Sequence, residues 1–282
     1  MTIQSRVAAA RQRLRDAGVS SADLDARLLA QHALQWTADR YLTRAADPEP
    51  DGFAAPYEAF ITRRAAREPV AYIIGQREFW GLEFEVGPDV LIPRPSTELI
   101  VEAVLDLFPD RHAPLALADI CTGCGCVAIA VAHERPDARV LATDISSDAL
   151  AVALRNAAKH SVASRVSFRQ TNLLDAVDGE FDAILANPPY VLDRARPALQ
   201  PEVRDFEPAV ALFGGDDGLG LIGGLVDQAP SRLRSGGYLI FEFGYGQDVE
   251  IEAFLNGSTY LTLVDMRKDL QGISRTAIAK RL

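Results

Sequence analysis

The stretch LALADICTGCGC, residues 115–126, begins as a short apolar run and passes into a glycine-rich turn. Apolar runs of this length that end in turn residues are typical of buried strands. Glycines in the turn allow the backbone to approach a ligand closely, and the helix predicted from Cys126 to Glu134 begins with unpaired N–H groups. We therefore expect a strand, a ligand-binding turn and a helix in succession.

Strands and helices alternate from this stretch to the C-terminus. The pattern predicts strands over residues 115–120, 139–143, 166–169, 181–186, 237–243, 260–265 and 274–280, and helices over residues 126–134, 147–159, 219–234 and 248–255. Such alternation indicates an α/β fold with a mostly parallel sheet that helices cover on both faces. The last two strands are joined by about eight residues, too few for a helical crossover, so the last strand should be antiparallel.

Residues 1–76 differ in character and are expected to form an N-terminal helical domain. Apolar residues such as Val7 and Leu14 recur at helix-like spacing. The cluster DPEPDG at residues 47–52 interrupts the pattern, and a further helix is predicted over residues 56–67. The domain fits either a plain helical bundle or a surface that docks the substrate.

Residues 77–98 are predicted to form a β-hairpin that links the two domains. The segment EFWGLEFEV, residues 78–86, alternates apolar and polar side chains, as a strand with one wet face does. Gly-Pro-Asp at residues 87–89 predicts the turn, and residues 90–92 the returning strand. Ser96 is then expected to cap a helix that starts near Thr97 and opens the third region, residues 99–282.

The composition places the chain among ordinary globular proteins. It has 282 residues, of which 48% are hydrophobic and 24% charged. No run approaches the roughly 20 apolar residues of a membrane span, and arginines interrupt any N-terminal signal peptide. The net charge of −10 argues against a stable complex with nucleic acid. We expect a cytoplasmic protein that binds no membrane.

The three cysteines, Cys121, Cys124 and Cys126, all lie within the glycine-rich turn. Their spacing is too close for a disulfide framework. Metal ligation together with His133 would be unusual, because zinc sites generally draw a second ligand pair from elsewhere in the chain. We expect no metal site and interpret the cysteines as small residues.

Asp144 ends the second predicted strand, about 20 residues after the turn. A carboxylate at this place can accept hydrogen bonds from ribose hydroxyls, although it can also cap the helix that begins near Ser147. Gly123, Gly125 and Ala128 satisfy the pattern G-x-G-x-x-A. A nicotinamide dinucleotide and S-adenosyl-L-methionine therefore both remain open as cofactors at this point.

Asn187-Pro188-Pro189-Tyr190 follows the fourth predicted strand, where a parallel sheet exposes its ligand crevice. The prolines stiffen the loop, remove two N–H groups and leave carbonyl acceptors, and the Asn187 side chain adds another acceptor. Tyr190 can stack on a planar group. An amide nitrogen is a poor nucleophile, so methyl transfer to it depends on alignment at about 3 to 3.5 Å. Acceptors on its N–H groups favour the charge that develops on it.

Together these residues resemble the protein-(glutamine-N(5)) methyltransferases, the PrmC/HemK family, which modify class I peptide-chain release factors. The resemblance covers nearly the whole chain. Its most specific segments are EPVAYIIG (68–75), REFWGL (77–82), LIPRPSTE (91–98), NPPY (187–190), GGDDGL (214–219) and DLQGISR (269–275).

This resemblance implies a Rossmann-like S-adenosylmethionine methyltransferase sheet, with a helical domain that helps to bind the release factor. The substrate would be the glutamine of the Gly-Gly-Gln motif, and the enzyme is expected to be a monomer. S-Adenosyl-L-methionine would be bound by Cys121, Thr122, Gly123, Cys124, Gly125, Asp144, Asn172, Leu173 and Asn187. The glutamine amide would be bound by Asn187, Pro188, Pro189 and Tyr190, of which Asn187, Pro188 and Tyr190 would act in catalysis.

The chain departs from the family pattern at four positions. Cys121 and Cys124 replace a glycine and a serine, and cysteine disfavours positive φ. Asn172 and Ser96 replace acidic residues. Alternative readings are glutamine methylation of a ribosomal protein, adenine-N(6) methylation of DNA, nicotinamide-dependent oxidoreduction, and cofactor binding without catalysis. IPRP and DLQGISR favour the release-factor group over the ribosomal-protein group.

Overall fold

The structure is a computed structural model that describes all residues from Met1 to Leu282. It divides into two compact units, one formed by Met1–Gln76 with Gln200–Phe206, the other by Arg77–Leu199 with Glu207–Leu282. None of the helices combines the length and the hydropathy that crossing a membrane requires.

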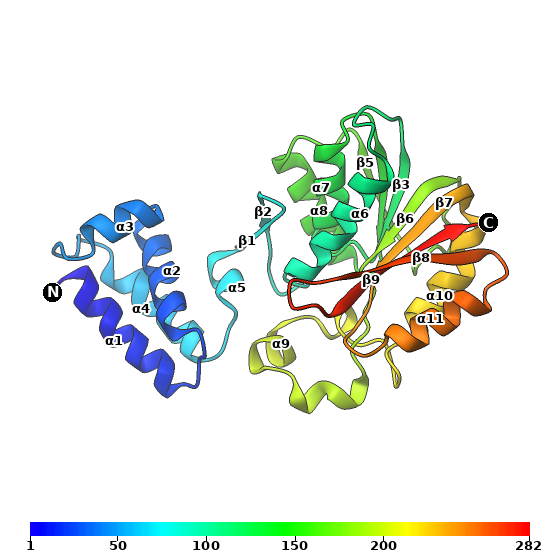
Figure 1. The fold of residues 1–282 in the computed structure, drawn as a ribbon. Coiled ribbons are helices and arrows are strands. Elements are labelled where there is room, and N and C mark those ends of the chain that lie inside the picture. The colour runs from blue at the N-terminus through cyan, green and yellow to red at the C-terminus, as the bar shows by residue number, and fades with distance from the viewer. The chain divides into compact units, whose positions relative to one another are not determined.

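The larger unit is built on a seven-stranded sheet of order β5-β4-β3-β6-β7-β9-β8 (Figure 1). Its strands are β3 (Ala116–Ile120), β4 (Arg139–Asp144), β5 (Val166–Gln170), β6 (Phe181–Ala186), β7 (Leu233–Glu242), β8 (Leu261–Lys268) and β9 (Ser274–Arg281). The neighbouring strands β5, β4, β3, β6 and β7 pair in parallel, whereas β9 pairs antiparallel with both β7 and β8. The predicted fold class is confirmed.

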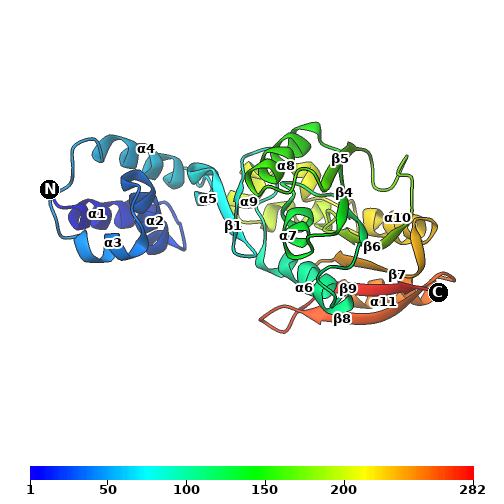
Figure 2. The ribbon, with the colours of Figure 1, turned by 90° about the horizontal axis from the view of Figure 1, so that it is seen from above.

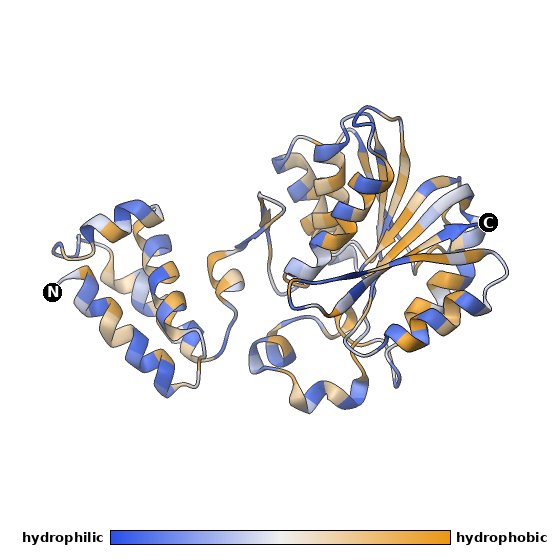
Figure 3. Cartoon of the chain, in the orientation of Figure 1, coloured by the Kyte–Doolittle hydropathy of each residue, from blue (hydrophilic) through white to orange (hydrophobic).

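Helices cover both faces of this sheet. They are α6 (Glu98–Leu107), α7 (Cys126–Glu134), α8 (Ser147–Lys159), α10 (Gly220–Gln228) and α11 (Asp248–Gly257). Figures 1 and 2 show α6, α7 and α8 on one face and α10 and α11 on the other. The central strands are largely apolar, because both of their faces are buried: Figure 3 shows them mostly in the hydrophobic colour.

The strand order reverses between β3 and β6, which lie side by side at the centre of the sheet. From β3 the chain moves outward to β4 and β5, and from β6 it moves in the opposite direction to β7. Ligands of open α/β sheets bind at the carboxyl ends of the strands at such a reversal. The glycine-rich turn after β3 and the NPPY loop after β6 therefore meet at one edge of the sheet.

The hairpin at the start of this unit turns earlier than the sequence pattern predicts. It consists of β1 (Gln76–Phe79) and β2 (Leu82–Glu85). Residues 87–89 do turn the chain, with the Val90 N–H donating to the Gly87 carbonyl at 3.1 Å, but this is not the hairpin turn, and the prediction of a returning strand at residues 90–92 is wrong. Trp80 (φ 55°) and Gly81 (φ 68°) form the two-residue turn, a geometry that matches the twist of paired strands. Trp80 tolerates this φ because Glu98 and Glu134 accept hydrogen bonds from its backbone and indole N–H groups at 2.9 and 3.2 Å.

Two further boundaries differ from the prediction. The helix predicted to Arg234 ends at Gln228, because Pro230 lacks an N–H group and Leu233 already pairs with β6. Ser96 does not cap α6: it lies in a 3₁₀ turn (Pro95–Thr97), and its hydroxyl donates to Glu242 instead.

The smaller unit is a helical bundle. Its helices are α1 (Ile3–Asp16), α2 (Ala22–Leu34), α3 (Ala38–Arg44), α4 (Ala54–Ala65), α5 (Val70–Ile74) and α9 (Pro201–Phe206). Side chains of Leu14, Leu29 and Ile61 form a fully buried core, and the Tyr57 hydroxyl donates to the Ala26 carbonyl at 3.0 Å. The bundle is the helical domain that the apolar spacing predicts.

A buried ion-pair network accounts for the presence of α9 in this unit. Arg64, only 4% exposed, donates to Asp25 and to Glu202, each at 2.8 Å. Arg67 also binds Glu202, at 2.6 Å. Burial alone would raise the pKa of Glu202, but the hydrogen bonds from Arg67 and Arg64 lower it to about 2. The network thus fixes a segment from late in the chain to α4.

The hairpin geometry is tested by comparing Gly81→Ala with Gly87→Ala. A side chain at Gly81 is strained by its positive φ, although nothing lies within 4 Å of it, whereas Gly87 has an ordinary φ and open space. We expect Gly81→Ala to lower the free energy of unfolding by about 1–2 kcal/mol and Gly87→Ala to change it by less than about 0.5 kcal/mol. Urea denaturation measures both, and the opposite ranking would contradict a turn at Trp80–Gly81.

Candidate active site

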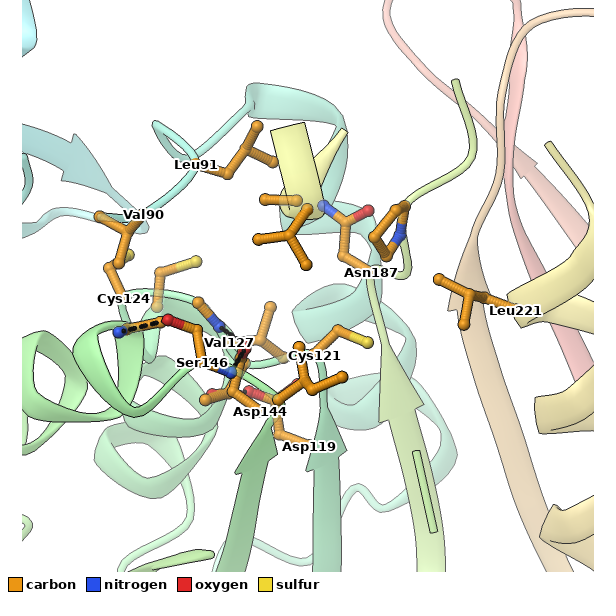
Figure 4. A pocket seen from close by; sticks show the side chains of 18 of the residues that line it. Val90, Leu91, Asp119, Cys121, Cys124, Val127, Asp144, Ser146, Asn187 and Leu221 are labelled. Carbon is orange, nitrogen blue, oxygen red and sulfur yellow. Dashed lines mark hydrogen bonds between the residues drawn. The ribbon is translucent and has the colours of Figure 1, made fainter. Parts of the chain in front are cut away.

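A cavity of about 270 Å³ lies at the carboxyl ends of β3, β4 and β6 (Figure 4). Asn187 lies on one side of it, and Cys121 and Asp144 lie on the other side in this view. Its walls include Leu91, Pro93, Thr97, Asp119, Cys121, Thr122, Gly123, Cys124, Asp144, Asn172, Leu173, Asn187 and Pro189. The structure thus brings together most of the residues that the sequence singles out.

The glycine-rich turn presents bare backbone to this cavity. Gly123 has a φ of 54°, and an added Cβ there would meet nothing within 4 Å, so the space beside it is open. At Gly125, by contrast, a Cβ would lie 3.0 Å from Ile129 and 3.1 Å from Ala153. Gly123 therefore leaves room for a ligand, and Gly125 lets α7 pack closely against α8.

Two cysteines of the turn, Cys124 and Cys126, are buried, and Cys121 is partly buried in the wall of the cavity. Cys121 adopts a φ of 59°, the left-handed conformation that favours the glycine it replaces. Burial raises the pKa of the Cys121 thiol, and the hydrogen bond with Cys124 together with burial raises that of Cys126, so these thiols stay protonated. No group of three or more His, Cys, Asp or Glu side chains is placed to hold a metal ion.

Asp144 ties the turn to the end of β4. Its Oδ2 accepts a hydrogen bond from the Gly123 N–H, and its Oδ1 accepts one from the Ser146 N–H, both at 2.9 Å. The cap of α8 is Ser146, whose hydroxyl oxygen accepts from the Ala149 N–H at 3.1 Å. Since each carboxylate oxygen carries a further lone pair, Asp144 can also accept hydrogen bonds from a ligand.

Asp119 is a site residue that the sequence reasoning missed. It lies on β3 in the wall of the cavity, is 1% exposed, and accepts hydrogen bonds from the Thr122 hydroxyl at 2.6 Å and the Ala128 N–H at 3.1 Å. Burial raises its pKa to about 7. The signal was available, because Asp119 is the one charged residue within an otherwise apolar strand.

The NPPY loop leaves β6 directly beside the cavity. The Asn187 amide nitrogen donates to the Thr97 hydroxyl at 3.1 Å, and no protein group donates to the amide oxygen Oδ1 or to the Pro188 carbonyl. Asn187 and Pro189 line the cavity, whereas Pro188 and Tyr190 are not among its lining residues. The Tyr190 hydroxyl donates instead to the buried carboxylate of Glu242 at 2.8 Å.

Comparison with known proteins identifies the family. A family model described as the PrmC N-terminal domain matches residues 7–75, and the methyltransferase small domain matches residues 96–201. The release factor glutamine methyltransferase of Cereibacter sphaeroides is 42% identical, over 96% of this chain and 96% of that protein. The chain belongs to the release factor glutamine methyltransferase family. The relative from Bradyrhizobium diazoefficiens is 40% identical, over 96% of this chain and 92% of its own length.

Membership of this family makes the chain a methyltransferase, and solved structures agree with the fold. A methyltransferase from Pyrococcus furiosus covers 79% of this chain and 96% of its own, with a TM-score of 0.54 at 19% identity. The T. thermophilus 16S rRNA N2 G1207 methyltransferase, solved with AdoMet and guanosine, covers 73% of this chain and 50% of its own, with a TM-score of 0.51 at 16% identity. At these identities the likeness concerns the fold alone.

In this family member, close backbone packing supports the NPPY loop. The Val191 N–H donates to the Leu212 carbonyl, and the Gly214 N–H donates to the Val191 carbonyl, each at 2.9 Å. A Cβ at Gly218 would overlap the Tyr190 carbonyl oxygen, which also accepts from the Gln247 side chain at 3.2 Å. The GGDDGL segment therefore needs its glycines to hold the loop that carries Asn187.

The buried Asp119 makes stability depend on pH. Its folded pKa of about 7 lies above the ordinary value of 3.8, so folding favours the protonated form, and stability falls as the pH rises through 7. Asp119→Asn keeps an oxygen for Thr122 and Ala128 and removes this dependence. We expect the free energy of unfolding of the variant, relative to wild type, to increase between pH 5 and pH 8 by a few kcal/mol at most. A difference that stays constant with pH would contradict this assignment.

Proposed function

We propose that this chain transfers a methyl group from S-adenosyl-L-methionine to the side-chain amide of the glutamine in the Gly-Gly-Gln motif of class I release factors. The observation that carries the proposal is the free acceptor oxygen of Asn187 at the wall of the cavity. Relatives that are about 40% identical along nearly their whole length, and are named release factor glutamine methyltransferases, support it.

The cavity residues fit the proposed cofactor. Gly123 leaves open space for the methionine part of the cofactor, and the Asp144 carboxylate has lone pairs for two ribose hydroxyls. Asn172 and Leu173 line the cavity next to Asp144 and would flank the adenine. When bound, S-adenosyl-L-methionine supplies an electrophilic methyl group on its sulfonium.

The NPPY loop would bind and orient the substrate nitrogen. A primary amide has two N–H groups, and the Asn187 Oδ1 and Pro188 carbonyl oxygens are two acceptors that no protein donor occupies. Holding both hydrogens aligns the nitrogen with the methyl group, and the same acceptors stabilise the positive charge that grows on nitrogen. Methyl transfer leaves the nitrogen with both hydrogens and a positive charge. Because this cation is strongly acidic, water can take one proton to give the neutral methylated amide, and a basic residue is not required.

The remaining regions receive supporting roles in this proposal. Residues 1–76 would dock the release factor, residues 77–98 would link them to the catalytic domain, and residues 99–282 would carry the chemistry. We further propose that the enzyme acts as a cytoplasmic monomer and forms no stable complex with nucleic acid.

A labelled-methyl assay tests this function directly. The enzyme is incubated with methyl-labelled cofactor and a class I release factor that carries either Gln or Ala at the third position of Gly-Gly-Gln. We expect label only in the Gln form, at that residue by mass mapping. Equal labelling of both forms would refute the proposal. In parallel reactions that offer a ribosomal protein or an adenine-containing duplex, label there but not in the release factor would also refute it.

The same assay examines Asn187. Asn187→Ala removes one acceptor for the substrate amide and should lower turnover by about 10²-fold or more, with little change in cofactor affinity. Isothermal titration with S-adenosyl-L-methionine provides the control for binding. Wild-type turnover in this variant would remove Asn187 from the proposed role.

A further inference from the structure

Glu242, at the end of β7, is a fully buried carboxylate whose position the sequence does not explain. Three hydroxyl groups surround it. Thr97 donates to its Oε2 at 2.7 Å, and Tyr190 and Ser96 donate to its Oε1 at 2.8 and 3.2 Å. A buried charge requires such partners, since it has lost the hydrogen bonds of water. The carboxylate is therefore held by hydroxyl donors that converge from the NPPY loop and from the residues just before α6.

One of these hydroxyls also contacts the NPPY asparagine. Thr97 Oγ1 lies 2.7 Å from Glu242 Oε2 and 3.1 Å from the amide nitrogen of Asn187. Burial raises the pKa of Glu242, and the hydrogen bonds from Thr97, Tyr190 and Ser96 oppose this shift because they stabilise the ionised form. In that form both carboxylate oxygens only accept, and a hydroxyl has a single hydrogen to donate. The Thr97 hydrogen is therefore committed to Glu242, and towards Asn187 the hydroxyl can act only as an acceptor.

This direction decides how the Asn187 side chain is turned. The two ends of an amide are nearly equal in size, so packing alone discriminates poorly between an oxygen and an NH₂ group at a given place. Only the NH₂ group can donate to Thr97, so the oxygen must take the other position. That oxygen meets no protein donor and belongs to a residue in the wall of the cavity.

We propose that Glu242 and Thr97 are positioning residues that orient the Asn187 amide with its oxygen available to the substrate nitrogen. The role described for this oxygen rests on the proposed function. In the reversed orientation an NH₂ group would face the NH₂ group of the substrate, and two donors cannot hydrogen-bond. We call the two successive hydrogen bonds, from Asn187 to Thr97 and from Thr97 to Glu242, the relay. The relay therefore matters for turnover more than for cofactor binding.

Ser96 provides a matched control within the same cluster. Its hydroxyl donates to Glu242 Oε1, which is not the oxygen that Thr97 contacts, and it makes no hydrogen bond with Asn187. Ser96→Ala thus removes a hydrogen bond from Glu242 without interrupting the path to Asn187. Thr97→Val interrupts the path and keeps nearly the same shape, and Thr97→Ser restores the hydroxyl.

The experiment measures kcat, cofactor affinity and the side-chain amide resonances of Asn187 in a ¹⁵N–¹H spectrum for these three variants. For Thr97→Val we expect kcat to fall 10- to 100-fold and the Asn187 resonances to move, while cofactor affinity changes less than about twofold. Thr97→Ser and Ser96→Ala should keep kcat within about threefold and leave the resonances near their wild-type positions. Thr97→Ala removes the same hydroxyl and replaces Thr97→Val if the latter folds poorly.

The two readouts separate this inference from the proposed function. Unchanged Asn187 resonances in Thr97→Val would overturn the relay, whatever the substrate is. Wild-type kcat in Thr97→Val, or an equal loss in Ser96→Ala, would also overturn it. Resonances that move only when the Thr97 hydroxyl is removed would support the relay even if release factors proved not to be the substrate.

Discussion

The hydrogen bond from the Asn187 amide to the Thr97 hydroxyl is the interaction on which the account of the site depends. It joins the loop after β6 to the residues that lead into α6, and Glu242 on β7 fixes its direction by accepting the hydrogen of the Thr97 hydroxyl. The bond is possible only because β6 and β7 are neighbours in the sheet and α6 packs against both of them. A polar contact at one end of the sheet is thus a consequence of the strand order.

The backbone around this bond is held with little freedom. The NPPY loop lies against the GGDDGL segment so closely that side chains at Gly214 and Gly218 would overlap its carbonyl oxygens. Glu207, buried beneath residues 92–94, accepts hydrogen bonds from the Ile92 N–H and the Arg94 guanidinium at 3.2 and 2.5 Å. Rigid support of this kind is needed where alignment, and not a strong base, lowers the barrier.

Local sequence predicts the elements whose ends carry clear signals. The helix at residues 147–159 and the strand at residues 181–186 agree with α8 and β6, since a serine cap or an apolar run marks their ends. The hairpin turn was misplaced because Gly-Pro-Asp is a stronger turn signal than Trp-Gly, and tryptophan rarely adopts a positive φ. Its stabilising contacts with Glu98 and Glu134 arise only in the folded chain.

The residues of the site also fall into those that local sequence predicts and those that it does not. The glycine-rich turn, Asp144 and the NPPY loop were predictable, because each is a local motif at the end of a strand. The roles of Thr97 and Glu242 were not predictable, because the two residues are 145 positions apart and their roles depend on a hydrogen bond that forms only in the folded chain. A buried acid within an apolar strand, as at Asp119 and Glu242, is the one sequence signal that would have found part of this network.

A crystal structure of the enzyme with S-adenosyl-L-homocysteine and a release factor tests the central claim most directly. The account predicts that the glutamine amide nitrogen lies about 3 Å from Asn187 Oδ1 and faces the sulfur, with the Asn187 NH₂ group still on Thr97. A complex in which Asn187 is turned away from the glutamine, or in which another group holds the amide nitrogen, would contradict it.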